Sequence, residues 1–505
     1  MKIIKILAVA FAAVLCSSYF SEAQNIATPA QKRGFTKLTT YSELAEFVKK
    51  LDAASPALTV KTIGSTKQGR DIFALKFSNN SKGLKTKVLI FAQQHGNEQS
   101  GKEGALLLAE QLIRPENRYL FNRLEVTIIP ISNPDGSEVN KRRNSAGMDL
   151  NRNHLIMTEP EVIAQHHLFD KELFDVTMDI HEYYPYGEES DSLGYHRNAD
   201  ECIGYLTNPD ASVKIRDFQF KEFTPFYSSY LKSNGDSWAF YTPGGVPDKD
   251  YFRFSTYDVN DGRQYYGIQN SLSFIQEGKN GTDCLADNLK HRAMSQCDGM
   301  MALIKFSYNN SEAIKKLVAN ERKGITGGAD EYVSLRMEHR TNGTPLSLHV
   351  QSHKTGRDSV VNVKEFRSKV VTVDSIRIPY GYLIPKSNLK LCGWVARQNF
   401  KIAQLGGREG RMYEISKING EEKVDFEDDI ISLPRTSTAK LSWSEFAAKY
   451  GSDVLEKYIF IPARQLKCKI LVIGLEPTSE LGLSTYTEFE DLVKQGEEYP
   501  VIRVR

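Results

Sequence analysis

Short apolar runs typical of β-strands alternate with helical patterns from about residue 87 to residue 310. Lys87 to Ala92 predicts a buried strand, and Gly101 to Ile113 predicts a helix whose apolar residues share one side. Further along the chain we expect a strand at 124–131, a helix at 161–169 and a strand at 174–180. Strands that alternate with helices favour an α/β fold with a mixed, mainly parallel sheet flanked by helices. Such sheets carry their sites at the carboxyl ends of strands.

The pattern changes after the glycine-rich segment 323–328, which predicts a linker. Beyond it, short β-rich runs are separated by Pro, Gly and Asn; they include KVVTVDSI, YGYLIP, KILVIGL and YPVIRV. We therefore expect an α/β domain over 24–322 and a smaller β-rich accessory domain over 329–505. Two other stretches lack a sustained period and predict loops: the aromatic-rich segment 218–266, whose rings could equally pack in the core, and the charged segment 417–429.

The first residues have the composition of a secretory signal peptide. Lys2 and Lys5 precede a short apolar run that ends at Leu15, and Ser21-Glu22-Ala23 is a small-x-small ending. The run is shorter than the roughly 20 apolar residues that span a bilayer, and no longer one follows. We expect residues 1–23 to be removed after Ala23, and the protein to be exported, secreted or periplasmic, without a membrane span.

Charge and cysteine content narrow the partners and the redox chemistry. The chain has 65 basic and 63 acidic side chains, so its balance gives no indication of a nucleic-acid partner. Five cysteines follow the signal segment, and Cys284 and Cys297 are the closest-spaced pair. Export permits a disulfide, but an odd count leaves at least one thiol unpaired.

His95 and Glu98 stand just past the first buried strand, and their spacing lets both side chains turn toward one metal ion. A catalytic zinc takes three protein ligands and keeps a fourth position open. Taken alone, the pair is more simply a polar turn at a helix start. A third ligand is expected at the end of another strand, and His181 ends the run FDVTMDI. These three residues form the metal-site hypothesis.

Further landmarks follow the first ligand in a fixed order: Asn133-Pro134-Asp135-Gly136, Arg142, Asp149 to Asn153, and Glu277 in SLSFIQEG. With His95, Glu98 and His181 they resemble the zinc metallocarboxypeptidases of the carboxypeptidase A type. The resemblance covers roughly residues 35 to 310. It implies one zinc ion per chain, bound by His95, Glu98 and His181.

The resemblance also implies a role for each remaining landmark. Glu277 would be the general base that takes a proton from water and returns it to the leaving amine. Arg142 would stabilise the negative charge that develops on the scissile carbonyl oxygen. Asn151 and Arg152 would hold the terminal carboxylate of the substrate, a task that suits a planar guanidinium.

The sequence departs from the family pattern in ways that bear on the substrate. Asn97 stands where the family has an arginine, which puts a secondary substrate contact in doubt. The mobile substrate-binding tyrosine of the family could be Tyr251 or Tyr257, since neither has the usual flanking residues. Side-chain selectivity is expected to come from the segment 258–263, without a particular residue being singled out.

The predicted function is hydrolysis of the C-terminal peptide bond of peptides or proteins that carry a free carboxylate. One alternative is a zinc amidase or deacylase of the same fold that acts on cell-wall peptides or acylated amino acids. Another is a non-catalytic protein that binds peptides or glycans. Arg142 with Asn151 and Arg152 favours the carboxypeptidase, and an intact Glu277 argues against a non-catalytic protein.

Overall fold

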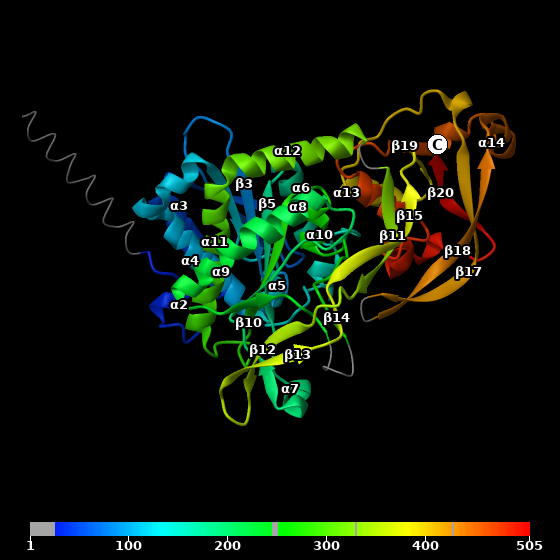
Figure 1. Ribbon diagram of the computed structural model, residues 1–505. Coiled ribbons are helices and arrows are strands. Elements are labelled where there is room, and N and C mark those ends of the chain that lie inside the picture. Colours follow the sequence, from blue (N-terminus) through cyan, green and yellow to red (C-terminus); the bar gives the residue numbers. More distant parts are fainter. Residues whose placement is uncertain (1–25, 245–250, 329–330, 427–428) are drawn as a thin grey trace, which may run out of the picture.

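The computed structural model describes residues 26–244, 251–328, 331–426 and 429–505, so the predicted signal peptide lies outside the described residues. An eight-stranded mixed sheet forms the centre of the α/β part (Figure 1), in the order β1-β2-β4-β3-β5-β10-β7-β8. Its strands are β1 (Leu58–Ser65), β2 (Asp71–Phe77), β3 (Thr86–Ala92), β4 (Leu124–Ile129), β5 (Val176–Tyr183), β7 (Glu201–Gly204), β8 (Trp238–Phe240) and β10 (Leu272–Lys279). The central strands β4, β3, β5 and β10 are parallel to one another, as the sequence predicts.

Both faces of this sheet are buried under other elements. Val88 and Ile90 of β3 belong to a core cluster that includes residues of α4 and α11, whereas Leu89 and Phe91 belong to a second cluster on the opposite face. Alternation along a strand sends successive side chains to opposite faces. The main helices are α3 (Tyr41–Ala54), α4 (Gln99–Ile113), α6 (Pro160–Glu172), α10 (Gly262–Gly267), α11 (Leu289–Asn309) and α12 (Ser311–Gly327).

The aromatic-rich stretch was expected to be loop, but its first part is helical. The segment forms α8 (Val213–Phe218), one wider turn over Gln219–Phe223, and α9 (Thr224–Asn234). The aromatic rings explain the difference, because Phe223 packs against Phe274 of β10 and Phe306 of α11, with ring centroids 4.4 and 5.2 Å away. Tertiary burial thus stabilises helices that local periodicity does not indicate.

The region after α12 is rich in antiparallel strands, as expected. A five-stranded sheet has the order β18-β17-β20-β16-β19, and three smaller sheets in the described residues contain the other strands of this region. The strands are β11 (Tyr332–Arg340), β12 (Leu346–Ser352), β13 (Asp358–Val363), β14 (Phe366–Arg367), β15 (Lys369–Arg377), β16 (Gly381–Pro385), β17 (Tyr413–Phe426), β18 (Asp429–Leu441), β19 (Tyr458–Pro462) and β20 (Glu498–Val504). Three helices accompany them: α13 (Leu389–Arg397), α14 (Trp443–Tyr450) and α15 (Cys468–Leu475).

Three local predictions in this region are wrong. The run KILVIGL is helix α15 rather than a strand, because a short apolar run that is buried all round has no period that separates the two structures. The charged segment 417–429 lies largely in strand β17, which pairs with β18 along its whole length. The expected linker is the last part of α12, which ends at Gly328 with a positive φ of 77°.

The β-rich region packs tightly onto the α/β part. Trp394 of α13 is fully buried in the same core cluster as Phe91 of β3. Its indole nitrogen donates to the carbonyl oxygen of Leu155 at 2.8 Å, and Gln398 donates to the same oxygen at 2.7 Å. Strand β12 also pairs with β6 (Tyr195–Arg197) of the α/β part. One hydrophobic core therefore spans both regions.

Two further expectations concern thiols and membranes. All five cysteines in the described residues are free, so Cys284 and Cys297 do not form the bridge that their spacing allowed. Cys297 is buried on α11, whereas Cys284 lies in the loop before that helix. None of the helices in the described residues has both the length and the apolar character needed to cross a membrane.

Candidate metal centre and cleft

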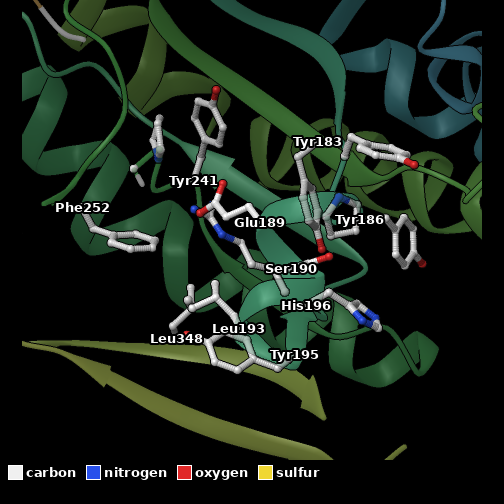
Figure 2. A pocket seen from close by; sticks show the side chains of 15 residues that line it. Tyr183, Tyr186, Glu189, Ser190, Leu193, Tyr195, His196, Tyr241, Phe252 and Leu348 are labelled. Carbon is white, nitrogen blue, oxygen red and sulfur yellow. The ribbon is translucent and has the colours of Figure 1, made fainter. Parts of the chain in front are cut away.

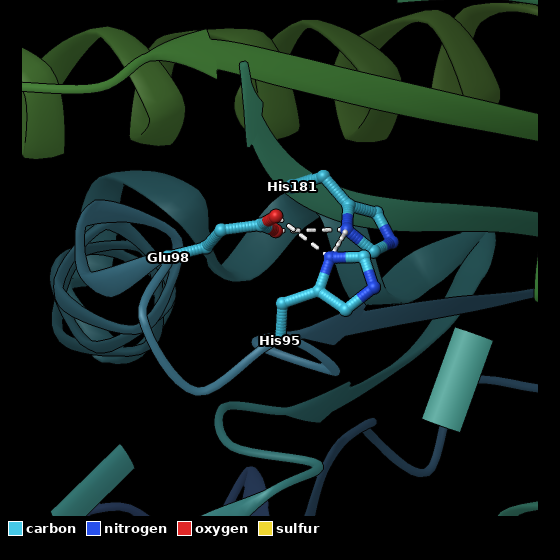
Figure 3. Close-up of side chains that lie close together, drawn as sticks. All are labelled: His95, Glu98 and His181. Carbon is cyan, nitrogen blue, oxygen red and sulfur yellow. Dashed lines mark hydrogen bonds and ion pairs between the residues drawn. The ribbon is translucent and has the colours of Figure 1, made fainter. Parts of the chain in front are cut away.

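Three side chains meet at the carboxyl ends of two neighbouring parallel strands (Figure 3). His95 follows β3, Glu98 begins α4, and His181 lies near the end of β5. His95 Nδ1 is 2.7 Å from Glu98 Oε1, and His181 Nδ1 is 2.8 Å from Glu98 Oε2. The two histidine Nδ1 atoms are 3.1 Å apart. The predicted ligand set is therefore assembled around one point.

The chemistry and surroundings of this group fit a zinc ion. Its ligand atoms lie within 4.8 Å of one another, and all three residues are buried. Two imidazoles and one carboxylate are a donor set that zinc takes in catalytic sites. The far ring nitrogens also have carboxylate partners, since His95 Nε2 lies 3.1 Å from Asp149 and His181 Nε2 lies 2.9 Å from Asp179. Such partners fix the orientation of histidine ligands.

The electrostatics of the group favour a cation. Burial alone would raise the pKa of Glu98, but the charges of His95 and His181 outweigh it and lower that pKa. Burial would likewise lower the pKa of His181, and the carboxylates of Asp179 and Glu98 raise it well above its usual value instead. The cluster thus concentrates negative charge in a buried place, where binding a divalent cation compensates it.

Glu277 lies on β10, directly opposite His181 of β5 in the parallel pairing. Its side chain is buried, and burial raises the pKa of its carboxyl group to about 7; Glu98 contributes in the same direction and His181 opposes it. A buried carboxyl group with a pKa near neutrality is suited to exchange protons with a substrate.

Arg142 stands at the edge of the metal centre with a side chain that is 47% exposed. Its Nη1 lies 3.2 Å from His95 Nδ1, and its Nε donates to Asp149 Oδ2 at 2.9 Å. Asp149 therefore contacts both a predicted metal ligand and the guanidinium group. The arrangement holds a permanent positive charge next to the ligands.

Asn151 and Arg152 follow Asp149 in a short 3₁₀ turn. The Asn151 amide is buried, its Nδ2 lies 3.2 Å from His181 Nε2, and its oxygen accepts hydrogen bonds from Gln94 and from the Gly262 backbone. Arg152 is exposed, and its Nη1 donates to the Asn151 carbonyl oxygen at 2.8 Å. Both residues accordingly lie beside the ligands, Asn151 held rigidly and Arg152 facing solvent.

Both tyrosines considered from the sequence contact the β-rich region. The Tyr257 hydroxyl is buried and donates to the Met337 carbonyl oxygen at 3.0 Å. The Tyr251 ring stacks under the guanidinium of Arg367 at 3.5 Å. Tyr241, which follows β8, is within electrostatic reach of the general-base candidate: burial, and then the charge of the Glu277 carboxylate, raises the pKa of Tyr241. The sequence pattern that could have placed Tyr241 at the end of a strand is the aromatic run WAFY followed by the turn residues Thr-Pro-Gly-Gly.

Tyr241 also lines a cavity of about 320 Å³ (Figure 2). Tyr183, two residues beyond His181, lines the cavity, whose walls combine aromatic rings with polar and charged side chains such as Glu189 and Arg197. They include Tyr183, Tyr184, Tyr186, Tyr195, Tyr241 and Phe252. Leu348 of β12 closes one side, so the β-rich region contributes to the cavity.

Comparison with known proteins supports the same interpretation. A family model described as zinc carboxypeptidase matches residues 44–198. Human carboxypeptidase D is 24% identical over 256 residues, which cover 43% of this chain and 18% of the relative. The human carboxypeptidase N catalytic chain is 34% identical over 135 residues, which cover 22% of this chain and 30% of the relative. The chain thus spans less than a third of the length of either relative.

Among solved structures, a metallo-carboxypeptidase from Pseudomonas aeruginosa aligns with a TM-score of 0.42 and 20% identity, covering 54% of this chain and 69% of that one. The matched segment contains the three candidate ligands His95, Glu98 and His181. Glu277 lies outside it. The segment 44–198, which contains the assembled ligand group, is therefore similar to the zinc carboxypeptidase family.

Proposed function

We propose that this protein is an exported zinc carboxypeptidase that hydrolyses the C-terminal peptide bond of peptides or proteins. The observation that carries the proposal is the placement of Glu277. Its buried carboxyl group has a pKa near 7 and stands opposite His181, beside a ligand group that fits zinc. A non-catalytic binding protein has no use for a proton acceptor at this position.

Each residue of the centre then has a chemical task. Zinc held by His95, Glu98 and His181 would supply a Lewis acid that lowers the pKa of a water molecule and polarises the scissile carbonyl. The Glu277 carboxylate accepts the proton of the attacking water. The protonated Glu277 then returns that proton to the leaving amine, which a pKa near 7 permits in both directions.

Two arginines would stabilise negative charge on the substrate. Arg142, held by Asp149, donates to the scissile carbonyl oxygen as negative charge develops there. Arg152 is exposed next to the ligands and pairs with the terminal carboxylate of the substrate. Asn151 shares this task, as the family resemblance implies; its side-chain oxygen is held by Gln94 and Gly262, and its amide nitrogen lies 3.2 Å from His181 Nε2.

The aromatic cavity suggests where the remainder of the substrate lies. Tyr183, two residues beyond His181, lines it, and Tyr241, which also lines it, is within electrostatic reach of Glu277. We place the residues upstream of the scissile bond in this cavity. Its ring-lined walls favour aromatic or apolar side chains at those positions.

A pair of peptides that differ only at the C-terminus tests the proposal. The mature chain is purified, its zinc content is measured, and a free-acid peptide and its C-terminal amide are followed by mass spectrometry. We expect single residues to be lost from the free acid only, and the loss to stop after chelation and to return with zinc. Internal cuts, or equal hydrolysis of the amide, contradict a carboxypeptidase.

The same assay separates the remaining possibilities. Hydrolysis of acylated amino acids without hydrolysis of peptides would favour the amidase. Export is tested independently by the N-terminal residue of the protein recovered outside the cytoplasm, which we expect to be Gln24. Recovery of Met1 at the N-terminus of that protein contradicts removal of a signal peptide.

A further inference from the structure

A second group of metal-ligand side chains lies outside the centre just described. Asp200 precedes β7, Asp236 precedes β8, and His291 is in the first turn of α11. Ligand atoms of the three residues lie within 4.8 Å of one another. The closest pair is Asp200 Oδ1 and His291 Nε2, at 2.7 Å. Three elements that are distant in the sequence thus bring an imidazole and two carboxylates together.

Unpartnered buried oxygens distinguish this group from an ordinary surface ion pair. Asp236 is only 7% exposed, and its Oδ2 makes no hydrogen bond of normal geometry among the described residues, although the nearby Ser295 hydroxyl acts to lower its pKa. Glu201, next to Asp200, is fully buried, and both of its carboxyl oxygens also lack a hydrogen bond of normal geometry there. Buried carboxyl groups in folded proteins are nearly always hydrogen-bonded, paired or bound to a metal.

The carboxyl groups also affect one another. Burial, then the negative charges of Asp298 and Asp200, raises the pKa of Asp236 to about 6. Burial, then Asp236 and Asp200, raises the pKa of Glu201 well above its usual value, although the Ser295 hydroxyl opposes this rise. Each carboxyl group therefore makes ionisation of its neighbours less favourable, an effect that a bound divalent cation would offset.

The nearby lysines are engaged with other groups. The Lys279 ammonium donates to Asn198 Oδ1 at 2.7 Å. The positive charge of Lys305 opposes the rise that burial causes in the pKa of Asp298. The Lys305 ammonium also lies 4.9 Å from the ring centroid of Tyr230. The exposed side chain of His291 is the cationic partner that reaches Asp200 directly. As a neutral imidazole, the same side chain can serve as a metal ligand.

We propose that Asp200, Asp236 and His291 bind a second divalent cation of the zinc class. An imidazole with two carboxylates suits zinc or manganese, whereas calcium prefers a shell of six to eight oxygens. The cation joins α11 to the chain segments that enter β7 and β8. Because β8 leads directly to Tyr241, the cation stabilises the edge of the sheet that borders the cavity.

Metal analysis of the full-length mature protein tests the proposal. The wild type and its variants are equilibrated with buffered Zn²⁺, separated from free metal, and analysed for bound zinc. We expect a second equivalent in the wild type and its loss in both Asp236→Asn and His291→Gln. Asp217→Asn, which removes an exposed carboxylate from an ion pair with Lys221, is the matched control and keeps both equivalents.

A thermal measurement isolates the second cation from the first. In His95→Gln, which lacks a ligand of the first centre, added Zn²⁺ should still raise Tm by several degrees, because a ligand that binds only the folded state stabilises it. The double variant His95→Gln with His291→Gln should show no rise. His291 is exposed, so its replacement is informative even if Asp236→Asn does not fold.

A single zinc equivalent in the wild type overturns the proposal, as does an unchanged zinc content in His291→Gln. These outcomes leave the carboxypeptidase proposal intact, since that proposal rests on the other ligand group. Conversely, loss of peptidase activity in a chain that keeps the His291-dependent zinc would affect only the carboxypeptidase proposal.

Discussion

Tyr241 is the residue whose role the structure changes most. Burial, and then the negative charge of Glu277, raises the pKa of Tyr241, so the two side chains interact electrostatically. We predict that Tyr241→Phe lowers kcat/KM for peptide hydrolysis by about 10- to 100-fold, because a hydrogen bond to a charged group is worth about 1.5–3 kcal/mol. Steady-state kinetics on one peptide measures the effect.

Tyr257→Phe is the matched control for that substitution. The Tyr257 hydroxyl donates to the Met337 carbonyl oxygen, in the contact between the two regions. Its removal should lower stability by about 1 kcal/mol and leave kcat/KM within about twofold. A larger kinetic effect in Tyr257→Phe than in Tyr241→Phe would show that the wrong tyrosine has been assigned to the substrate.

Glu161 near the start of α6 gives a prediction about pH. Burial, then the charge of Glu159, raises the pKa of Glu161 to about 7, although Asn144 lies within reach of its oxygens. The folded chain therefore holds a proton between pH 4.5 and 7 that the unfolded chain releases, and stability falls as pH rises through this window.

Replacing Glu161 with Gln removes that loss. We predict that at pH 8 the free energy of unfolding of Glu161→Gln, measured with urea, is about 1–3 kcal/mol higher than that of the wild type. Near pH 4.5 the two proteins should have the same free energy of unfolding. Glu116→Gln, a change at an exposed site, should have no such pH dependence. Equal effects of Glu161→Gln at both pH values would contradict the raised pKa.

At the residue scale, strand-end positions made His95, Glu98 and His181 a metal-site hypothesis, which the structure assembles, whereas the role of Glu277 follows from the family resemblance and remains a prediction. The partners of the ligands could not be predicted. Asp179 lies 2.9 Å from His181 Nε2, a side-chain orientation that the sequence does not specify, and the hydrogen bond from Gly262 to Asn151 comes from a segment far away in the sequence. Those contacts depend on tertiary packing, which has no local signal.

At the scale of elements, the central strands and α4 follow from apolar runs of the expected length. Helix α15 could not be predicted in this way, because all of its residues are buried and it therefore lacks the alternation of apolar and polar residues that reveals a helical period. The charged residues of β17 also conceal a strand, since they occupy the exposed positions of a long hairpin. Periodicity is visible only where an element has one buried and one exposed face.

The contact between α15 and α13 gives a prediction for glycine. A Cβ atom on Gly474 would lie 2.7 Å from the ring of Trp394. We predict that Gly474→Ala destabilises the protein by about 1–3 kcal/mol in urea unfolding, although alanine is the better helix former by about 1 kcal/mol. The overpacked ring cannot move, because its indole donates to Leu155.

Gly327 is the matched control near the end of α12. A Cβ atom there would meet nothing within 4 Å. Gly327→Ala should be neutral or stabilising by up to about 1 kcal/mol. Stabilisation by Gly474→Ala of the same size would contradict the close packing of α15 against α13.

At the scale of the whole molecule, the shared core implies joint unfolding. Trp238 reports on the α/β part, and Trp394 and Trp443 report on the β-rich region. We predict coincident urea transitions by tryptophan fluorescence and far-ultraviolet circular dichroism, because the core cluster that contains Trp394 and Phe91 cannot be opened on one side only. Two separated transitions would indicate independent domains.

The sequence predicts a boundary near residue 322, and that boundary remains a prediction. Composition could not indicate how extensively the two parts of the chain contact each other across this boundary. The contacts include the hydrogen bond from Trp394 to Leu155 and the pairing of β12 with β6. The change from mixed to β-rich patterning reveals a change of architecture. It carries no information on whether the two architectures share a core.

The central claim is that this chain uses Glu277 to remove C-terminal residues from peptides. The most direct test follows one free-acid peptide by mass spectrometry with the wild type and Glu277→Gln at equal zinc content. We predict stepwise loss of C-terminal residues by the wild type, and a rate at least about a hundredfold lower in the variant, which keeps its zinc. Equal rates in the two proteins would contradict the claim.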